Sequence, residues 1–225
     1  MSIQPRFALS SLAFTLCVLA GLTLPVQAQD VSFDNLKRVE NSEMAVAYID
    51  PEADFSVYRR VAILQPYVAF RANWQRDQNR SSVTRVSARD MERIRADVGS
   101  LLEDVLVEAL EADNGYEVVS GAADDVLLVR PAIIDLDVTA PDTNTAGRTR
   151  QISSTAGAAT LYIELFDSVS GKIIGRAADR RIAGRAGGMM QWSNAVTNRS
   201  EARRMFRPWA DRLRAFMDSH YSGDN

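Results

Sequence analysis

The amino-acid sequence predicts an α+β protein built as a two-layer sandwich, in which a mostly antiparallel sheet is packed by one central and one C-terminal helix. Two observations predict this fold class. Residues 87–112 and 200–220 carry apolar side chains at the spacing of an amphipathic helix. Apolar runs of strand length, separated by turn residues, occur at 61–70, 116–120, 126–138, 158–166 and 172–183. The order of strand, helix, several strands and helix is typical of a two-layer α+β arrangement.

The composition excludes several classes of protein. The 225-residue chain is 46% hydrophobic and 24% charged, which excludes disordered, collagen-like and polytopic membrane proteins. One Cys and one His are too few for a cluster of thiolate or imidazole metal ligands or for a disulfide framework. The net charge of −3 lacks the basic footprint of a nucleic-acid binder. We therefore expect no metal, no cofactor and no nucleic-acid partner.

Residues 1–28 are predicted to be a secretory signal peptide. A short polar start precedes an apolar run at 7–24, and the small residue Ala28 is followed by Gln29 at the expected cleavage position. The apolar run is nearly long enough to span a bilayer, so an uncleaved anchor helix is the alternative. Pro25, which breaks a helix just before the cleavage motif, favours removal.

The single cysteine, Cys17, lies inside this segment. It follows the bulky Leu16, whereas lipoprotein signals carry Gly, Ala or Ser there, so the sequence offers no convincing lipid anchor and leaves membrane association open. Without residues 1–28 the chain would contain no Cys, which suits folding in an oxidising compartment. We expect a periplasmic or secreted protein.

After the signal peptide we expect three regions. Residues 29–54 are weakly patterned and are predicted to form an extended lead-in. Residues 55–221 are predicted to form a single α+β domain, and residues 222–225 are predicted to be a disordered tail.

The first half of the domain combines one strand, one loop and one helix. Pro66 lies inside the predicted strand 61–70 and favours an edge position or a bulge. The polar residues 71–87 predict a long loop. Ser87 can cap the first turn of the central helix, and Gly115 is expected to supply a positive φ at its end.

The second half is mainly strands. Residues 126–138 alternate as a strand, with Asp135 and Asp137 predicted to share one face where helix cover ends. A hairpin is expected over 158–183. Pro208 interrupts the C-terminal helix, where either a kink or the start of a second helix is expected.

Four segments carry a further pattern: Tyr58 to Val61; Asp124 to Arg130 with Ile134 to Leu136; Glu164 to Ile174 with Asp179 to Arg181; and Phe206 to Leu213. Over about residues 36–221 the chain resembles the bacterial domain of unknown function 3313 family. The resemblance implies an exported envelope protein, often lipid-anchored in that family, with no activity assigned to the class. No catalytic residue is therefore carried over, and the missing lipidation site departs from the family pattern.

The residues also give little support for an enzyme. The only His, His220, is the sixth residue from the end of the chain, where an exposed position at a helix end is expected, so a Ser-His-Asp or Cys-His mechanism is not predicted. No nucleophile elbow, phosphate-binding loop or dinucleotide motif is present. Asp135 and Asp137 could act as a paired acid and base or hold a hard cation with Asp142, but such carboxylates are also common at the wet ends of strands.

Charged residues suggest one further cluster. Glu164 and Asp167 flank a hairpin whose returning strand carries Arg176, Asp179, Arg180 and Arg181, and this predicts carboxylates facing guanidinium groups across strands, either as a surface ladder or as a binding site. The polar cluster that we name as a candidate site is Asp135, Asp137, Arg180 and Arg181. Arg outnumbers Lys 24 to 2, which fits either a GC-rich codon preference or an acidic partner.

The loops supply the candidate partner-binding residues. Trp74 and Trp192 lie in polar segments, where a large aromatic side chain either plugs the edge of a core or forms a contact patch. Arg148 and Arg150 lie in another such segment. We predict a non-catalytic envelope accessory protein that binds another envelope protein or assembly, with its oligomeric state left open. The alternative is a small-ligand-binding or carboxylate-assisted hydrolytic protein that uses Asp135 and Asp137.

Overall fold

The computed structural model describes residues 35–81, 85–138, 157–182 and 195–220. The strands are β1 (Lys37–Arg38), β2 (Val46–Ile49), β3 (Arg60–Ile63), β4 (Tyr67–Phe70), β5 (Glu117–Val118), β6 (Val126–Val138), β7 (Gly157–Asp167) and β8 (Ile173–Ile182). The helices are α1 (Trp74–Ser81), α2 (Ala88–Glu111) and α3 (Ala195–His220), with 3-10 turns at Phe55–Val57 and Ala112–Asn114.

Eight strands form one sheet in the order β1-β2-β8-β7-β6-β3-β5, and β4 also pairs with β6. The long strands β6, β7 and β8 pair antiparallel, as do β2 and β1, whereas β3 and β4 run parallel to β6 and β5 runs parallel to β3. The predicted strand 61–70 is thus two strands, which follow one another along β6. Pro66 lies between them and has no N–H to donate to a ladder.

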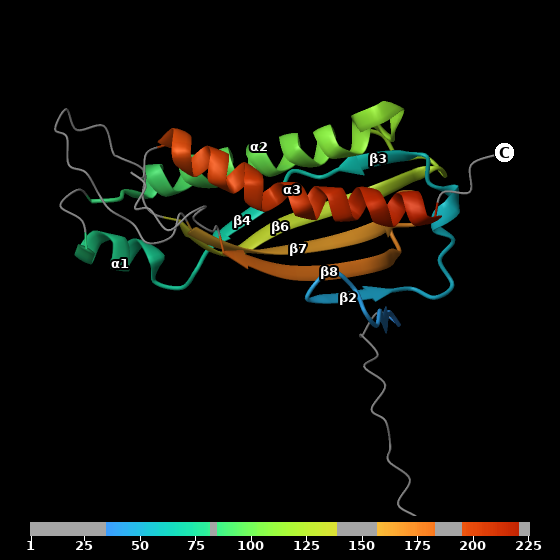
Figure 1. Ribbon diagram of the computed structural model, residues 1–225, viewed down its shortest axis with the longest axis horizontal. Helices are drawn as coiled ribbons and strands as arrows, with labels where there is room; N and C mark the ends of the chain where they lie inside the picture. Colours follow the sequence, from blue (N-terminus) through green and yellow to red (C-terminus); the bar gives the residue numbers. More distant parts are fainter. Residues whose placement is uncertain (1–34, 82–84, 139–156, 183–194, 221–225) are drawn as a thin grey trace, which may run out of the picture.

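Helices α2 and α3 lie side by side over one face of the sheet (Figure 1). Their apolar stripes meet the inward-facing residues of β6 and β7, and together they form the core. The largest fully buried side chains include Leu102, Leu106 and Leu110 of α2, Phe206 and Trp209 of α3, and Leu127, Ile133 and Leu161 of the sheet. The predicted α+β sandwich is confirmed, with a sheet that is mixed.

Helix α2 begins where the sequence predicts. Ser87 Oγ accepts a hydrogen bond from the Asp90 amide at 3.2 Å, and Asp90 Oδ2 accepts one from the Ser87 amide at 2.9 Å. This reciprocal pair is a capping box, which satisfies two amides at the helix start.

The end of α2 differs from the prediction. Asp113 and Asn114 adopt the positive φ values, 54° and 57°, whereas Gly115 has a φ of −71°. Glycine is required here for another reason: a Cβ at Gly115 would overlap the guanidinium of Arg214 and the carbonyl oxygen of Leu110. The Arg214 side chain extends from α3 and donates to the Leu110 carbonyl at 2.9 Å. This bond gives a partner to one of the carbonyl groups that are left free at the C-terminal end of α2.

Helix α1 occupies part of the segment 71–87 that was predicted to be a loop. Its sequence is polar apart from Trp74, so no apolar stripe indicates a helix. The backbone amide of Val86 donates to Asn79 Oδ1 at 2.6 Å, and this bond ties α1 to the chain that leads into α2.

The predicted lead-in also contains regular structure. Strands β1 and β2 lie within residues 29–54, and β2 pairs with β8, so this region contributes to the sheet. At the other end of the chain, α3 continues through Pro208, and no second helix begins there.

The predicted signal peptide 1–28, its cleavage position at Ala28 and Gln29, and the tail 222–225 lie outside the described residues. Among the helices that are described, none combines the length and the apolar composition needed to cross a membrane.

Candidate functional site

The two faces of the sheet differ in chemistry. Because side chains alternate along a strand, Leu161, Ile163 and Leu165 of β7 point to α2 and α3, whereas Tyr162 and Glu164 point to the opposite side. We call this side the outer face. It is the face of the sheet that α2 and α3 leave uncovered (Figure 1).

A row of charged side chains crosses the middle of the outer face. The strand register places Glu164 of β7 between Arg130 of β6 and Arg176 of β8. Arg130 Nε donates to Glu164 Oε2 at 2.7 Å, and a second Arg130 nitrogen contacts the same oxygen. Arg176 Nη2 donates to Glu164 Oε1 at 3.2 Å. We call these three residues the Arg–Glu–Arg row.

The carboxylate of this row is buried although it lies on the outer face. Glu164 is 4% exposed, whereas the Arg130 side chain is 54% exposed. Tyr162 is the third residue that donates to Glu164, through its hydroxyl group at 2.9 Å. A buried carboxylate is stable only when its oxygens are paired in this way.

The same contacts set the protonation states. Burial alone would raise the pKa of Glu164, but the hydrogen bonds from Arg130 and Tyr162 and the nearby positive charges outweigh it, so its pKa is lowered. For Tyr162, burial and then the bond to Glu164 raise the pKa to about 12. These shifts keep the Glu164 carboxyl ionised and the Tyr162 hydroxyl protonated at neutral pH, so the carboxylate remains an acceptor for all three neighbours.

Aromatic rings surround the Arg–Glu–Arg row. The Arg130 guanidinium lies over the Phe166 ring, 4.9 Å from its centroid, and Arg176 lies 6.0 Å from the centroid of Tyr162. Tyr67 of β4 is the register partner of Ala132 of β6, which in turn pairs with Tyr162, and Tyr67 is 66% exposed. Exposed Tyr and Arg side chains are enriched at protein interfaces.

Arginines outnumber carboxylates around the Arg–Glu–Arg row. Arg130, Arg176 and Arg180 lie there with Glu164 as the carboxylate among them. Arg180 donates to Thr160 Oγ1 at 3.2 Å, a neutral acceptor. Three guanidinium groups therefore lie near one buried carboxylate in the middle of the outer face.

The predicted carboxylate–guanidinium ladder is only partly assembled. Glu164 does pair with Arg176. Asp179 instead faces α3, where it accepts hydrogen bonds from Trp209 Nε1 at 2.8 Å and from Arg181 Nε at 3.2 Å. Asp167 lies in the hairpin turn and accepts the Ser170 amide at 2.7 Å.

The predicted cluster of Asp135, Asp137, Arg180 and Arg181 is divided among other partners. Asp137 pairs with Arg71 at 3.0 Å. Arg180 donates to Thr160, and Arg181 donates to Asp179. Among the described residues, no group of three carboxylate, imidazole or thiol side chains could hold a metal ion.

The strand carrying these aspartates is irregular, which the sequence did not indicate. Asp135 has a φ of 52°, and the pairing of β6 with β7 shifts between Ile134 and Asp137. The bulge reverses the alternation, so Leu136 is buried whereas Ile134 is exposed. The prediction that residues 126–138 alternate as one regular strand is therefore wrong at this point.

Of the candidate partner-binding residues, the structure describes Trp74. It is 1% exposed, stacks on Phe70 at a centroid distance of 4.2 Å and donates its indole N–H to the Val138 carbonyl at 2.9 Å. Trp74 thus plugs the edge of the core, which was one of the two alternatives, and offers no contact surface. Arg148, Arg150 and Trp192 lie outside the described residues.

His220 differs from the exposed residue that was expected. Its ring packs against Phe216 and Phe55, with centroid distances of 4.5 and 5.3 Å, at the end of α3. His220 therefore belongs to an aromatic cluster at the edge of the core.

Sequence reasoning missed Arg130, Tyr162 and Tyr67. A signal was present, because Tyr162, Glu164 and Phe166 occupy alternate positions of one strand. That alternation shows which residues share a face, but only the register shows that Arg130 lies beside Glu164.

Comparison with solved structures gives distant likenesses. The PelC dodecamer from Paraburkholderia phytofirmans is 12% identical, with a TM-score of 0.38 over 71% of this chain and 91% of that chain. Protein XCC0632 from Xanthomonas campestris is 14% identical, with a TM-score of 0.38 over 73% and 86%. The hypothetical protein CT253 from Chlamydia trachomatis is 10% identical, with a TM-score of 0.38 over 71% and 98%. Likenesses at this level carry no conclusion about function.

No curated protein matches the sequence. The model of one protein family does, and it covers residues 28–213, most of the chain. The match includes all four segments that carry the resemblance described above. The chain belongs to the family described as "Protein of unknown function (DUF3313)".

Proposed function

We propose that this chain is a non-catalytic, exported protein of the bacterial cell envelope that binds an acidic surface of another envelope protein through the outer face of its sheet. The observation that carries the proposal is the concentration of Tyr67, Tyr162, Phe166 and arginine side chains around the Arg–Glu–Arg row. Export rests on the predicted signal peptide at residues 1–28.

The chemistry of the outer face favours an acidic protein partner. Glu164 holds the two guanidinium groups of Arg130 and Arg176 in fixed positions, so little side-chain entropy is lost when a partner binds them. Rigid aromatic rings beside them supply apolar contact area at low entropic cost. The guanidinium groups of Arg130, Arg176 and Arg180 would attract an acidic surface to this part of the face.

The alternative that uses Asp135 and Asp137 has less support. Asp137 is already paired with Arg71, and the bulge at Asp135 interrupts the regular face on which the two carboxylates were expected. We therefore do not propose a hydrolytic or cation-binding role for them.

Photo-cross-linking in intact cells tests the proposal. A photoreactive amino acid replaces Tyr67 on the outer face, and a matched probe replaces Val169, which is exposed in the turn between β7 and β8. We expect one reproducible envelope partner at Tyr67 and none at Val169. Cross-linking of the same proteins at both positions, or of none at Tyr67, would contradict the proposal.

A charge reversal gives an independent check. Arg180→Glu changes the sign of one charge on the outer face, and Arg93→Glu makes the same change on α2, in the other layer. We expect Arg180→Glu to lower the cross-linking yield at Tyr67 and Arg93→Glu to leave it unchanged. Equal yields in the two variants would show that the charge of the outer face is not used.

A further inference from the structure

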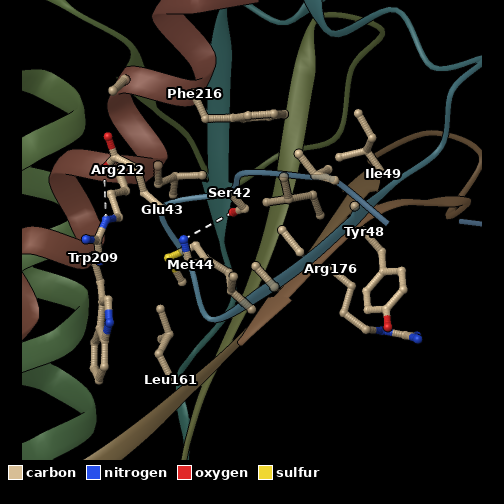
Figure 2. A pocket seen from close by; sticks show the side chains of 18 of the residues that line it. Ser42, Glu43, Met44, Tyr48, Ile49, Leu161, Arg176, Trp209, Arg212 and Phe216 are labelled. Atoms are coloured by element: carbon tan, nitrogen blue, oxygen red, sulfur yellow. Dashed lines mark hydrogen bonds and ion pairs between the residues drawn. The ribbon is translucent and has the colours of Figure 1, made fainter. Parts of the chain in front are cut away.

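A cavity of about 470 Å³ lies between the C-terminal half of α3 and the strands β2, β8 and β7, on the side opposite the outer face (Figure 2). Its floor includes Leu161, Ile163 and Ala177 of the sheet. Met44 and Phe216 form part of its walls. This volume is in the range of small-molecule sites, about 300–1,000 Å³.

Small residues create the cavity. Ala47 of β2 and Ala177 of β8 are register partners, and both line the cavity where α3 passes over the sheet. The next register pair is Ile49 with Gly175, which has no side chain at all. Larger side chains at Ala47 and Ala177 would extend into this space.

One end of the cavity is polar. Arg212 of α3 pairs with Glu43 at 3.1 Å and with Asp179 at 3.4 Å. The Glu43 side chain is 80% exposed, so its bond to Arg212 is weak and easily exchanged. Figure 2 shows Arg212 and Glu43 at one side of the cavity, whereas the side chains of Tyr48 and Arg176 point away from it.

We infer that this cavity binds a single-chain carboxylate amphiphile, of which a medium-chain fatty acid is the simplest example. Its hydrocarbon chain lies along the apolar floor over Leu161 and Ala177, and its carboxylate replaces Glu43 at Arg212. Removal of the chain from water supplies the driving force, because the walls are apolar. The carboxylate preserves the charge balance of Arg212, which a cationic amphiphile would not.

The inference does not rest on the proposed function. The cavity lies on the helix side of the sheet, whereas the proposed protein partner binds the outer face. Loss of amphiphile binding and loss of the cross-linked partner are therefore separate outcomes.

Binding is tested on the whole exported chain by calorimetric titration with decanoate and with decanol, both below the concentration at which they aggregate. We expect saturable binding of one decanoate per chain, tighter than that of decanol. The absence of saturable decanoate binding would overturn the inference.

Two substitutions on neighbouring residues locate the site. Ala177→Phe fills the cavity, whereas Ala178→Phe adds the same ring to the outer face, because adjacent strand residues point to opposite sides. We expect Ala177→Phe to weaken decanoate binding at least tenfold and Ala178→Phe to leave it within twofold, provided that both variants keep the urea midpoint of the parent chain. Equal losses in two folded variants would place the ligand elsewhere.

Should Ala177→Phe fail to fold, Glu43→Gln keeps the inference testable, since Glu43 is exposed. Removal of the competing carboxylate should tighten decanoate binding about two- to fivefold, the range of an exposed ion pair, and should leave decanol binding unchanged. An unchanged affinity for decanoate would show that its carboxylate does not bind at Arg212.

A membrane lipid could supply the same chemistry, so vesicles of phosphatidylglycerol form a separate arm. Cosedimentation with vesicles in the absence of saturable decanoate binding would assign the apolar contact to a membrane surface and overturn the inference. The inference is supported if the chain binds decanoate and remains in the supernatant when the vesicles are sedimented.

Discussion

At the scale of single residues, the most buried carboxylate in the described part of the chain is that of Glu164. It is buried, and it is stabilised by the guanidinium groups of Arg130 and Arg176 and by the hydroxyl of Tyr162. Removal of the carboxylate charge leaves two guanidinium groups facing each other over a partly dry site. The same residue therefore supports both the local stability and the shape of the proposed binding face.

We predict that Glu164→Gln lowers the free energy of unfolding by about 1–3 kcal/mol. This loss of unfolding free energy is smaller than that expected for a fully buried ion pair, because the Arg130 side chain is half-exposed. Glu108→Gln is the matched control, since Glu108 also pairs with two arginines, Arg203 and Arg207, but is half-exposed. Its loss should stay below about 1 kcal/mol. Urea unfolding measures both values, and equal losses would contradict the role assigned to burial.

A second prediction at this scale concerns pH. The Lys172 ammonium, which donates to Asp50, and the Glu52 amide lower the pKa of Asp50 below its usual value of 3.8. A carboxyl with a lowered pKa in the folded state stabilises the protein above its unfolded pKa, and this contribution disappears as the pH falls through the folded value. We expect the urea midpoint of the parent chain to fall more steeply below about pH 4 than that of Asp50→Asn.

Lys172→Met controls for this effect, because it removes the main cause of the shift and keeps the carboxyl group. Its midpoint should fall along a curve between those of the parent chain and Asp50→Asn, because the Glu52 amide still donates to the carboxyl group. Parallel curves for the three proteins between pH 6 and pH 3 would show that the Asp50–Lys172 pair does not contribute to acid stability.

At the scale of elements, the junction between α2 and α3 depends on a close approach at Gly115. A Cβ there would collide with Arg214, which donates to the carbonyl groups of Leu110 and Ala112, each at 2.9 Å. We predict that Gly115→Ala costs about 1–3 kcal/mol of unfolding free energy, as overpacking does elsewhere. Gly121→Ala is the control, because no heavy atom lies within 4 Å of its added Cβ. Its effect should stay within about 0.5 kcal/mol in the same urea assay.

The elements also show which features the sequence could predict. The strand Val126–Val138 and the start of α2 at Ser87 agree with the prediction, because a long apolar run and a capping residue are local signals. Helix α1 was missed because its only buried anchor is Trp74, and one residue makes no periodic stripe. The bulge at Asp135 was missed because the sequence pattern continues through it unchanged.

At the scale of the whole molecule, the candidate site depends on pairings between distant strands. Arg130 and Glu164 are 34 residues apart in sequence, and only the register of β6 with β7 places them side by side. The sequence does show that a hairpin brings Glu164 opposite Arg176, since that contact is local. The contact of Glu164 with Arg176 could therefore be predicted from the sequence, whereas its contact with Arg130 could not.

The same topology predicts an order of local stability. Strand β7 pairs along most of its length with β6 on one side and β8 on the other, whereas β1 and β5 are two-residue strands at the two ends of the sheet. Amides in the centre of the sheet open only with the whole domain, and those at its ends open locally. We therefore expect hydrogen exchange to be slowest in β7 and fastest in β1 and β5.

Strand β2 decides how far the cooperative unit extends. It comes from the region that the sequence predicted to be an extended lead-in, and it joins the sheet through four register pairs with β8. It also forms one wall of the apolar cavity. Native-state exchange followed by mass spectrometry should place β2 between β7 and β1 in protection, and saturating decanoate should slow exchange in β2 while leaving β5 unchanged. Exchange in β2 as fast as in β1, with or without decanoate, would show that the lead-in lies outside the cooperative core and that the cavity has no stable outer wall.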